Sequence, residues 1–80
     1  MSRKEKLIKK FLENPGGLKV WEVGRILMWF GFERVEAKGS HVKFKHVFRN
    51  VELSIPVHGG DCKRYYKIKI SKLLKMNFYE

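Results

Sequence analysis

The fold of this protein depends mainly on residues 32–57, which read FERVEAKGSHVKFKHVFRNVELSIPV. Apolar and polar side chains alternate along most of this stretch, and a period of two is typical of strands with one buried face. Gly39-Ser40 and Arg49-Asn50 interrupt the alternation and are typical turn sequences. The pattern predicts three consecutive strands: one from Phe32 onward, one over residues 41–48 and one over residues 51–57.

The same alternation assigns the faces of these strands, because successive side chains of a strand point to opposite sides. We expect the inward positions to be Val35 and Ala37 with Glu33 on the same side, then Val42, Phe44 and Phe48, then Val51, Leu53, Ile55 and Val57. Pro56 is expected in an edge strand. The opposite, open face is expected to carry Arg34, Lys38, His41, Lys43 and Lys45.

Two helices are predicted before this stretch. Ser2 and Glu5 have the spacing of an N-terminal capping box, and the sequence NPGG of residues 14–17 ends the first helix. A second helical pattern covers residues 19–30, where apolar residues recur at intervals of three and four. Gly24 lies inside this pattern and indicates close packing of the helix against a neighbour.

A third helix is predicted from Arg64 onward, because the apolar spacing is again helical. Residues 67–70 alternate and fit a short strand equally well, but the downstream spacing favours a helix. The order helix, helix, three strands, helix corresponds to an α+β fold with a three-stranded antiparallel sheet covered by helices on one face. We expect a single domain over residues 1–80.

The composition favours a polyanionic partner. The 80 residues include 18 Lys plus Arg against 8 Asp plus Glu, which gives a formal charge of +10. Such an excess attracts nucleic acid, an anionic membrane surface or an acidic protein. The length excludes a large barrel or a doubly wound dehydrogenase.

The sequence also suggests a compartment. Cys62 is the only cysteine, so an internal disulfide is excluded. The basic start of the chain lacks the apolar run of a secretory signal, and the longest apolar block, residues 26–30, is too short to span a membrane. We therefore expect a cytoplasmic protein. The second helix carries three large apolar residues that fit a membrane-facing surface or, more ordinarily, contact with the core or a partner: Trp21, Met28 and Trp29.

His41 is the candidate catalytic residue. It follows Gly39-Ser40 and shares its predicted face with Lys43 and Lys45. An imidazole in this setting can take the proton from a ribose 2′-hydroxyl, while the lysines stabilise the charge that develops on the phosphorus. The alternative interpretation from these residues is a solvated histidine beside ordinary surface lysines.

A zinc site is the second chemistry to consider, because the chain contains His41, His46, His58 and Cys62. The spacing fits zinc poorly. His41 and His46 lie an odd number of residues apart on one predicted strand, so their side chains face opposite sides of the sheet. We expect no metal and no cofactor.

Several basic residues have the interleaved arrangement that holds a phosphate backbone without reading bases: Lys38, Lys43, Lys45, Arg49, Lys63 and Arg64. The alternative is that these side chains are simply solvated. Because the positive excess is not balanced on any other predicted element, nucleic-acid binding is favoured.

Four segments together resemble the HicA family of mRNA interferase toxins. They are Gly31-Phe32-Glu33, Lys38-Gly39-Ser40-His41-Val42-Lys43-Phe44, Leu53-Ser54-Ile55-Pro56-Val57-His58-Gly59 and Leu73-Leu74. The resemblance covers nearly the whole chain after Val20. By this resemblance residues 19–76 form the toxin core, and residues 1–17 look like the N-terminal helical extension of some members.

The resemblance implies a double-stranded-RNA-binding-domain-like fold, a metal-independent endoribonuclease that cleaves mRNA, and a HicB-type antitoxin that masks the site. The family's catalytic histidine falls on His41, and the RNA-binding set then includes Gly39 and Ser40. Many members have a second histidine next, where this chain has Val42; His58 is the candidate helper. A non-catalytic RNA-binding module of the same fold is the alternative.

Overall fold

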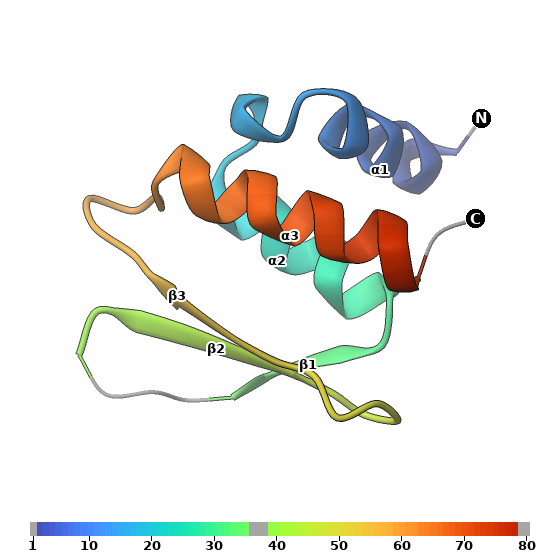
Figure 1. The fold of residues 1–80 in the computed structure, drawn as a ribbon. Coiled ribbons are helices and arrows are strands. Elements are labelled where there is room, and N and C mark those ends of the chain that lie inside the picture. The colour runs from blue at the N-terminus through green and yellow to red at the C-terminus, as the bar shows by residue number, and fades with distance from the viewer. Residues whose placement is uncertain (1, 36–38, 79–80) are drawn as a thin grey trace.

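The computed structural model describes residues 2–35 and 39–78 (Figure 1). No helix in these two ranges is long and apolar enough to cross a membrane. The elements follow the order expected from the sequence, with one additional 3-10 turn, η1: α1 (Arg3–Glu13), η1 (Pro15–Gly17), α2 (Val20–Trp29), β1 (Phe32–Val35), β2 (His41–His46), β3 (Glu52–Pro56) and α3 (Arg64–Asn77). The strand alternative for residues 67–70 is wrong, because they lie inside α3.

The three strands form one antiparallel sheet in the order β1-β2-β3, so β2 is central and Pro56 lies in an edge strand as predicted. In the register of β2 and β3, Val42 lies opposite Ile55 and Phe44 opposite Leu53. Residues directly opposite each other share a face of the sheet. The inward face predicted for these parts of β2 and β3 is therefore confirmed.

Helices cover one face of this sheet. Figure 1 shows α2 and α3 on one side of the strands and α1 beyond these two helices, away from the sheet. The buried apolar side chains come from all three layers: Ile8, Phe11, Leu12, Leu18, Val23, Ile26, Leu27, Phe32, Phe44, Ile55, Ile70 and Leu74. The α+β, double-stranded-RNA-binding-domain-like fold predicted from the sequence is confirmed.

Local sequence explains the ends and packing of the first two helices. Ser2 Oγ accepts a hydrogen bond from the Glu5 N–H at 3.1 Å, so the predicted cap begins α1. The helix ends before Pro15, which begins η1. In α2, a Cβ atom on Gly24 would lie 3.0 Å from Phe44 Cζ. The close helix–sheet packing indicated by Gly24 is confirmed.

The predicted faces of the first strand are wrong. Arg34 lies opposite Phe44, which is buried under the helices, whereas Val35 lies opposite Lys43 on the open face. The reason is that β1 begins with Phe32, which is only 3% exposed, and a shift of one residue moves every side chain of a strand to the other face. Ala37 and Lys38 lie outside the described residues.

The end of the second strand also differs from the prediction. β2 ends at His46, which is buried, and Phe48 is 91% exposed instead of facing the core. Residues 47–51 form a loop between β2 and β3 in place of a tight Arg49-Asn50 turn. The His46 ring causes this difference, because its Nδ1 accepts the N–H groups of Phe48 and Arg49 and so draws the chain out of the strand.

Candidate functional site

His41 begins β2 and is exposed on the face of the sheet that the helices leave open. Its backbone position is held by β3, since it lies opposite Pro56 and the neighbouring Ser40 carbonyl accepts the Val57 N–H at 2.7 Å. Gly39 has φ +74°, a conformation that glycine adopts without strain. The segment before His41 is thus a turn that presents the imidazole at the end of the sheet.

A shallow hollow lies beside His41. Its lining residues come from β1, β2, the turn before β2 and the residue that follows β3: Arg34, Val35, Gly39, Ser40, His41, Val42 and Val57. Three of these lining residues carry polar side chains that can interact with RNA: Arg34, Ser40 and His41. The sequence predicted Arg34 on the open face, but the register of β1 places this residue on the helix-side face. Arg34 nevertheless borders the hollow.

Lys43 and Lys45 share the open face with His41, as predicted, because both alternate with inward-facing residues of β2. Lys43 Nζ lies 3.5 Å from Glu52 Oε1, and both side chains are about half exposed. Lys45 lies opposite Glu52 on one side and Glu33 on the other. An exposed ion pair contributes about 0–1 kcal/mol, so Lys43 exchanges this partner for another anion at little cost.

Three of the other predicted basic residues, Arg49, Lys63 and Arg64, lie outside the strands of the sheet. Arg49 lies in the loop after β2, where its Nη1 donates to the Asn77 carbonyl at 2.9 Å and its guanidinium lies 4.6 Å from the Phe78 ring centroid. Arg64 begins α3, and its side chain borders Gly16 in the helical layer. Lys63 is the exposed N-cap residue of α3. Lys38 lies outside the described residues.

His58 is exposed beyond the end of β3 and does not line the hollow beside His41. The backbones of His58 and Asp61 exchange two hydrogen bonds, of 2.8 and 3.2 Å. Gly59 and Gly60 between them have φ +62° and +82°, as a type I′ turn requires. A helper role for His58 stays a prediction.

His46 is a structural residue that sequence reasoning left unassigned. Its Nδ1 accepts the N–H groups of Phe48 and Arg49 at 3.1 and 3.0 Å, so the proton of the neutral ring lies on Nε2, which donates to the Phe30 carbonyl at 2.8 Å. The ring therefore joins the end of α2 to the loop after β2. The signal was present in the sequence, because His46 has the same parity in the strand as Val42 and Phe44. His46 and His41 face opposite sides of the sheet, as predicted.

We expect His46→Ala to lower the free energy of unfolding by about 1–3 kcal/mol, because the N–H groups of Phe48 and Arg49 lose their acceptor and the bond from the ring to the Phe30 carbonyl is lost. Urea denaturation followed by circular dichroism measures this change. His58→Ala is the matched control, since that exposed ring makes none of these bonds. Equal stability of the two variants would show that the buried network contributes nothing.

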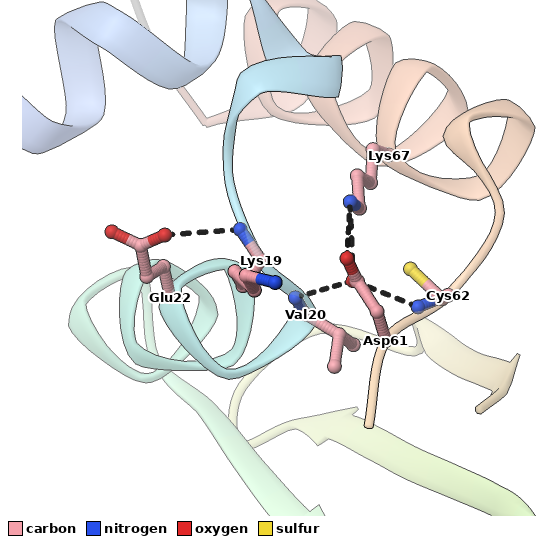
Figure 2. A network of polar contacts seen from close by, with 6 residues as sticks. All are labelled: Lys19, Val20, Glu22, Asp61, Cys62 and Lys67. Atoms are coloured by element: carbon pink, nitrogen blue, oxygen red, sulfur yellow. Dashed lines mark hydrogen bonds and ion pairs between the residues drawn. The ribbon is translucent and has the colours of Figure 1, made fainter. Parts of the chain in front are cut away.

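Asp61 joins the loop after β3 to both neighbouring helices (Figure 2). Its Oδ1 accepts the N–H groups of Val20, at the start of α2, and of Cys62, at 2.9 and 2.8 Å. The Lys67 ammonium of α3, whose side chain is 6% exposed, lies 3.1 Å from the same oxygen. This carboxylate thus caps one helix and neutralises a buried cation of another.

The same contacts change two acid–base equilibria. Burial raises the pKa of the Asp61 carboxyl. The N–H of Cys62, the Lys67 ammonium and the N–H of Val20 together lower this pKa by more than burial raises it, so it lies below its ordinary value. Burial raises the pKa of the Cys62 thiol. A protonated thiol is a poor zinc ligand and a poor nucleophile.

The fold and this site define a small α+β domain with a double-stranded-RNA-binding-domain-like fold and an exposed histidine that shares its sheet face with two lysines. A family model described as HicA toxin of bacterial toxin-antitoxin matches residues 22–76, which is more than half of the chain. The chain belongs to this family of toxins, whose systems pair a toxin with an antitoxin. Comparisons with curated proteins and with solved structures gave no match.

Proposed function

We propose that this toxin is a metal-independent endoribonuclease that cleaves mRNA, with His41 as its general acid and base. The observation that supports this proposal most directly is that the exposed His41 lines a hollow together with Arg34. Membership of the toxin family supports a role in arresting growth.

In the proposed reaction the His41 imidazole removes the proton from a ribose 2′-hydroxyl. The 2′-oxygen then forms a bond to the adjacent phosphorus, and the bond from phosphorus to the 5′-oxygen of the next nucleotide breaks. That 5′-oxygen receives a proton from the imidazolium or from water. In this proposal the negative charge on the phosphorane is stabilised by Lys43, which shares the open face with His41, and by Arg34, which borders the hollow from the helix-side face, as cations do in phosphoryl transfer.

This mechanism predicts the products. We expect wild-type protein to fragment a long unstructured RNA in the presence of EDTA and to leave 2′,3′-cyclic phosphate and 5′-hydroxyl ends. DNA of the same sequence lacks the nucleophile and should stay intact. Gel electrophoresis and end-group analysis measure both results. Cleavage of DNA, or inhibition by EDTA, would contradict the mechanism.

One observation favours the non-catalytic RNA-binding module as a second candidate. Among the described residues that line the hollow, His41 has the one imidazole, so no second histidine is available there to divide the roles of acid and base. A folded wild-type protein that binds RNA and never cleaves it would favour this second candidate.

We further propose that a HicB-type antitoxin with an acidic surface covers the open face of the sheet. The formal charge of +10 on 80 residues favours such a partner. Association should slow as salt increases, and Lys43 should become protected from acetylation in the complex. Full modification of Lys43 in the purified complex would show that the antitoxin binds another surface.

A further inference from the structure

A groove lined by α2 and the sheet lies next to the hollow beside His41. It lies between α2 and the sheet, where Trp21 and Met28 border it from the helix, and it shares Arg34, Val42 and Val57 with the hollow. The two depressions therefore lie side by side. Trp21 is 60% exposed and Met28 is 58% exposed, so these apolar side chains are available to a ligand.

A second groove continues from the first between α1 and α2. It shares Trp21, Arg25 and Trp29 with the first groove. Its other wall is formed by one side of α1, which carries Arg3, Lys4, Lys6 and Lys10. We call the hollow and the two grooves together the α2 track.

The second groove of the α2 track, between α1 and α2, is strongly positive. Glu22 is the one acidic residue that lines it, and its Oε1 accepts the Lys19 N–H at 3.0 Å. Among the residues that the structure describes, the ion pairs join Lys9 to Glu13, Lys43 to Glu52 and Lys67 to Asp61. The four cations of the α1 wall take part in none of them.

Aromatic rings form part of the same surface. The Arg25 guanidinium lies 5.7 Å from the Trp21 ring centroid, and Lys4 Nζ lies 5.8 Å from that of Trp29. Cations beside exposed aromatic rings are the arrangement that binds single-stranded nucleic acid, in which bases stack on rings and phosphates contact the charges.

We propose that the α2 track binds the single-stranded RNA that flanks the cleaved bond. A base stacks on Trp21, and the α1 cations contact phosphates further along the strand. The proposal rests on the proposed function for the placement of the cleaved bond at His41. The proposal also extends beyond the proposed function. The α1 wall of the track lies outside residues 22–76, the region that matches the family model.

The test measures binding separately from cleavage. The chain contains two tryptophans, and both lie in the α2 track, so intrinsic fluorescence reports on its occupation. The full-length His41→Ala protein is titrated with an unstructured 12-nucleotide RNA over a series of salt concentrations. Lys6→Ala/Lys10→Ala in the same background is compared with Lys69→Ala/Lys72→Ala, which removes the same charge from exposed positions of α3.

We expect RNA to quench the tryptophan fluorescence. The Lys6→Ala/Lys10→Ala variant should flatten the slope of log affinity against log salt by about 1.4, since each phosphate contact on a single strand contributes about 0.7, and the α3 control should leave it unchanged. Trp21→Ala should weaken binding by about 5- to 150-fold, whereas Tyr65→Ala, on α3 and 64% exposed, should not. Melting curves confirm that each variant is folded.

Three outcomes separate the hypotheses. Equal salt slopes for the two double variants, together with unchanged affinity of Trp21→Ala, would overturn the proposal even if wild-type protein cleaves RNA. Quenching and a flattened slope without any cleavage by wild-type protein would support the α2 track and contradict the proposed catalysis. Quenching by phosphatidylserine vesicles but not by RNA would assign the surface to a membrane and overturn the proposal.

Discussion

His41→Ala should lower the rate of RNA cleavage by about 100- to 10,000-fold, because the loss of a positioned general acid and base typically has an effect of this size. The fold should be unaffected, since the imidazole is exposed at the start of β2 and its removal leaves no core cavity. RNA affinity should also survive, because the binding energy is expected from Lys43, Lys45 and the α2 track. Single-turnover cleavage of a labelled RNA measures the rate.

Two further measurements make this result specific. His58→Ala removes another exposed histidine, and a much smaller effect than that of His41→Ala is expected because His58 does not line the hollow. Comparable losses in both variants would make His58 a partner in the chemistry. Equal cleavage by wild type and His41→Ala would remove His41 from the mechanism.

Asp61→Ala should lower the free energy of unfolding by about 3 kcal/mol. Removal of one member of a buried ion pair typically costs about 3–5 kcal/mol, because the other charge stays buried without a partner. The lower end applies here, since the Asp61 side chain is 34% exposed while that of Lys67 is 6% exposed. The N–H groups of Val20 and Cys62 lose their acceptor as well. Urea denaturation at pH 7 measures the change.

The matched control is Glu13→Ala, which breaks the exposed pair with Lys9 and should change stability by less than about 1 kcal/mol. Lys67→Met combined with Asp61→Ala should recover part of the loss, because no buried charge is then left alone. If Asp61→Ala were no more destabilising than Glu13→Ala, the network in Figure 2 would have no structural importance.

The lowered pKa of Asp61 predicts how this contribution depends on pH. A carboxyl with a lower pKa in the folded state binds fewer protons there than in the unfolded state, so its contribution is fully present above the unfolded value of about 3.9. The contribution is lost as the pH falls below that value through the folded pKa. The stability difference between wild type and Asp61→Ala should therefore narrow as the pH falls below about 3.9, and a constant difference would contradict this assignment.

Much of the fold follows from local patterns in the sequence. Ser2 and Pro15 mark the limits of α1 because capping and the constraint on the residue before proline act within one turn of a helix. The alternation in residues 41–45 and 52–56 predicts the faces of β2 and β3 because strand geometry has a period of two. The place of His41 on the open face follows from the same parity.

The other features of the fold and of the site depend on contacts between residues that are distant in the sequence. The face of Arg34 depends on the register with Phe44, and a period of two without an anchor leaves both faces equally acceptable. The role of Asp61 as the cap of α2 joins residues 41 positions apart, which no local propensity encodes. The α2 track likewise exists because α1 packs beside α2, and because Arg34 and Val57, from opposite edges of the sheet, border the same depressions. Periodicity and capping are local properties of the chain, whereas ion pairs, grooves and strand register arise only when the packed layers bring separate segments together.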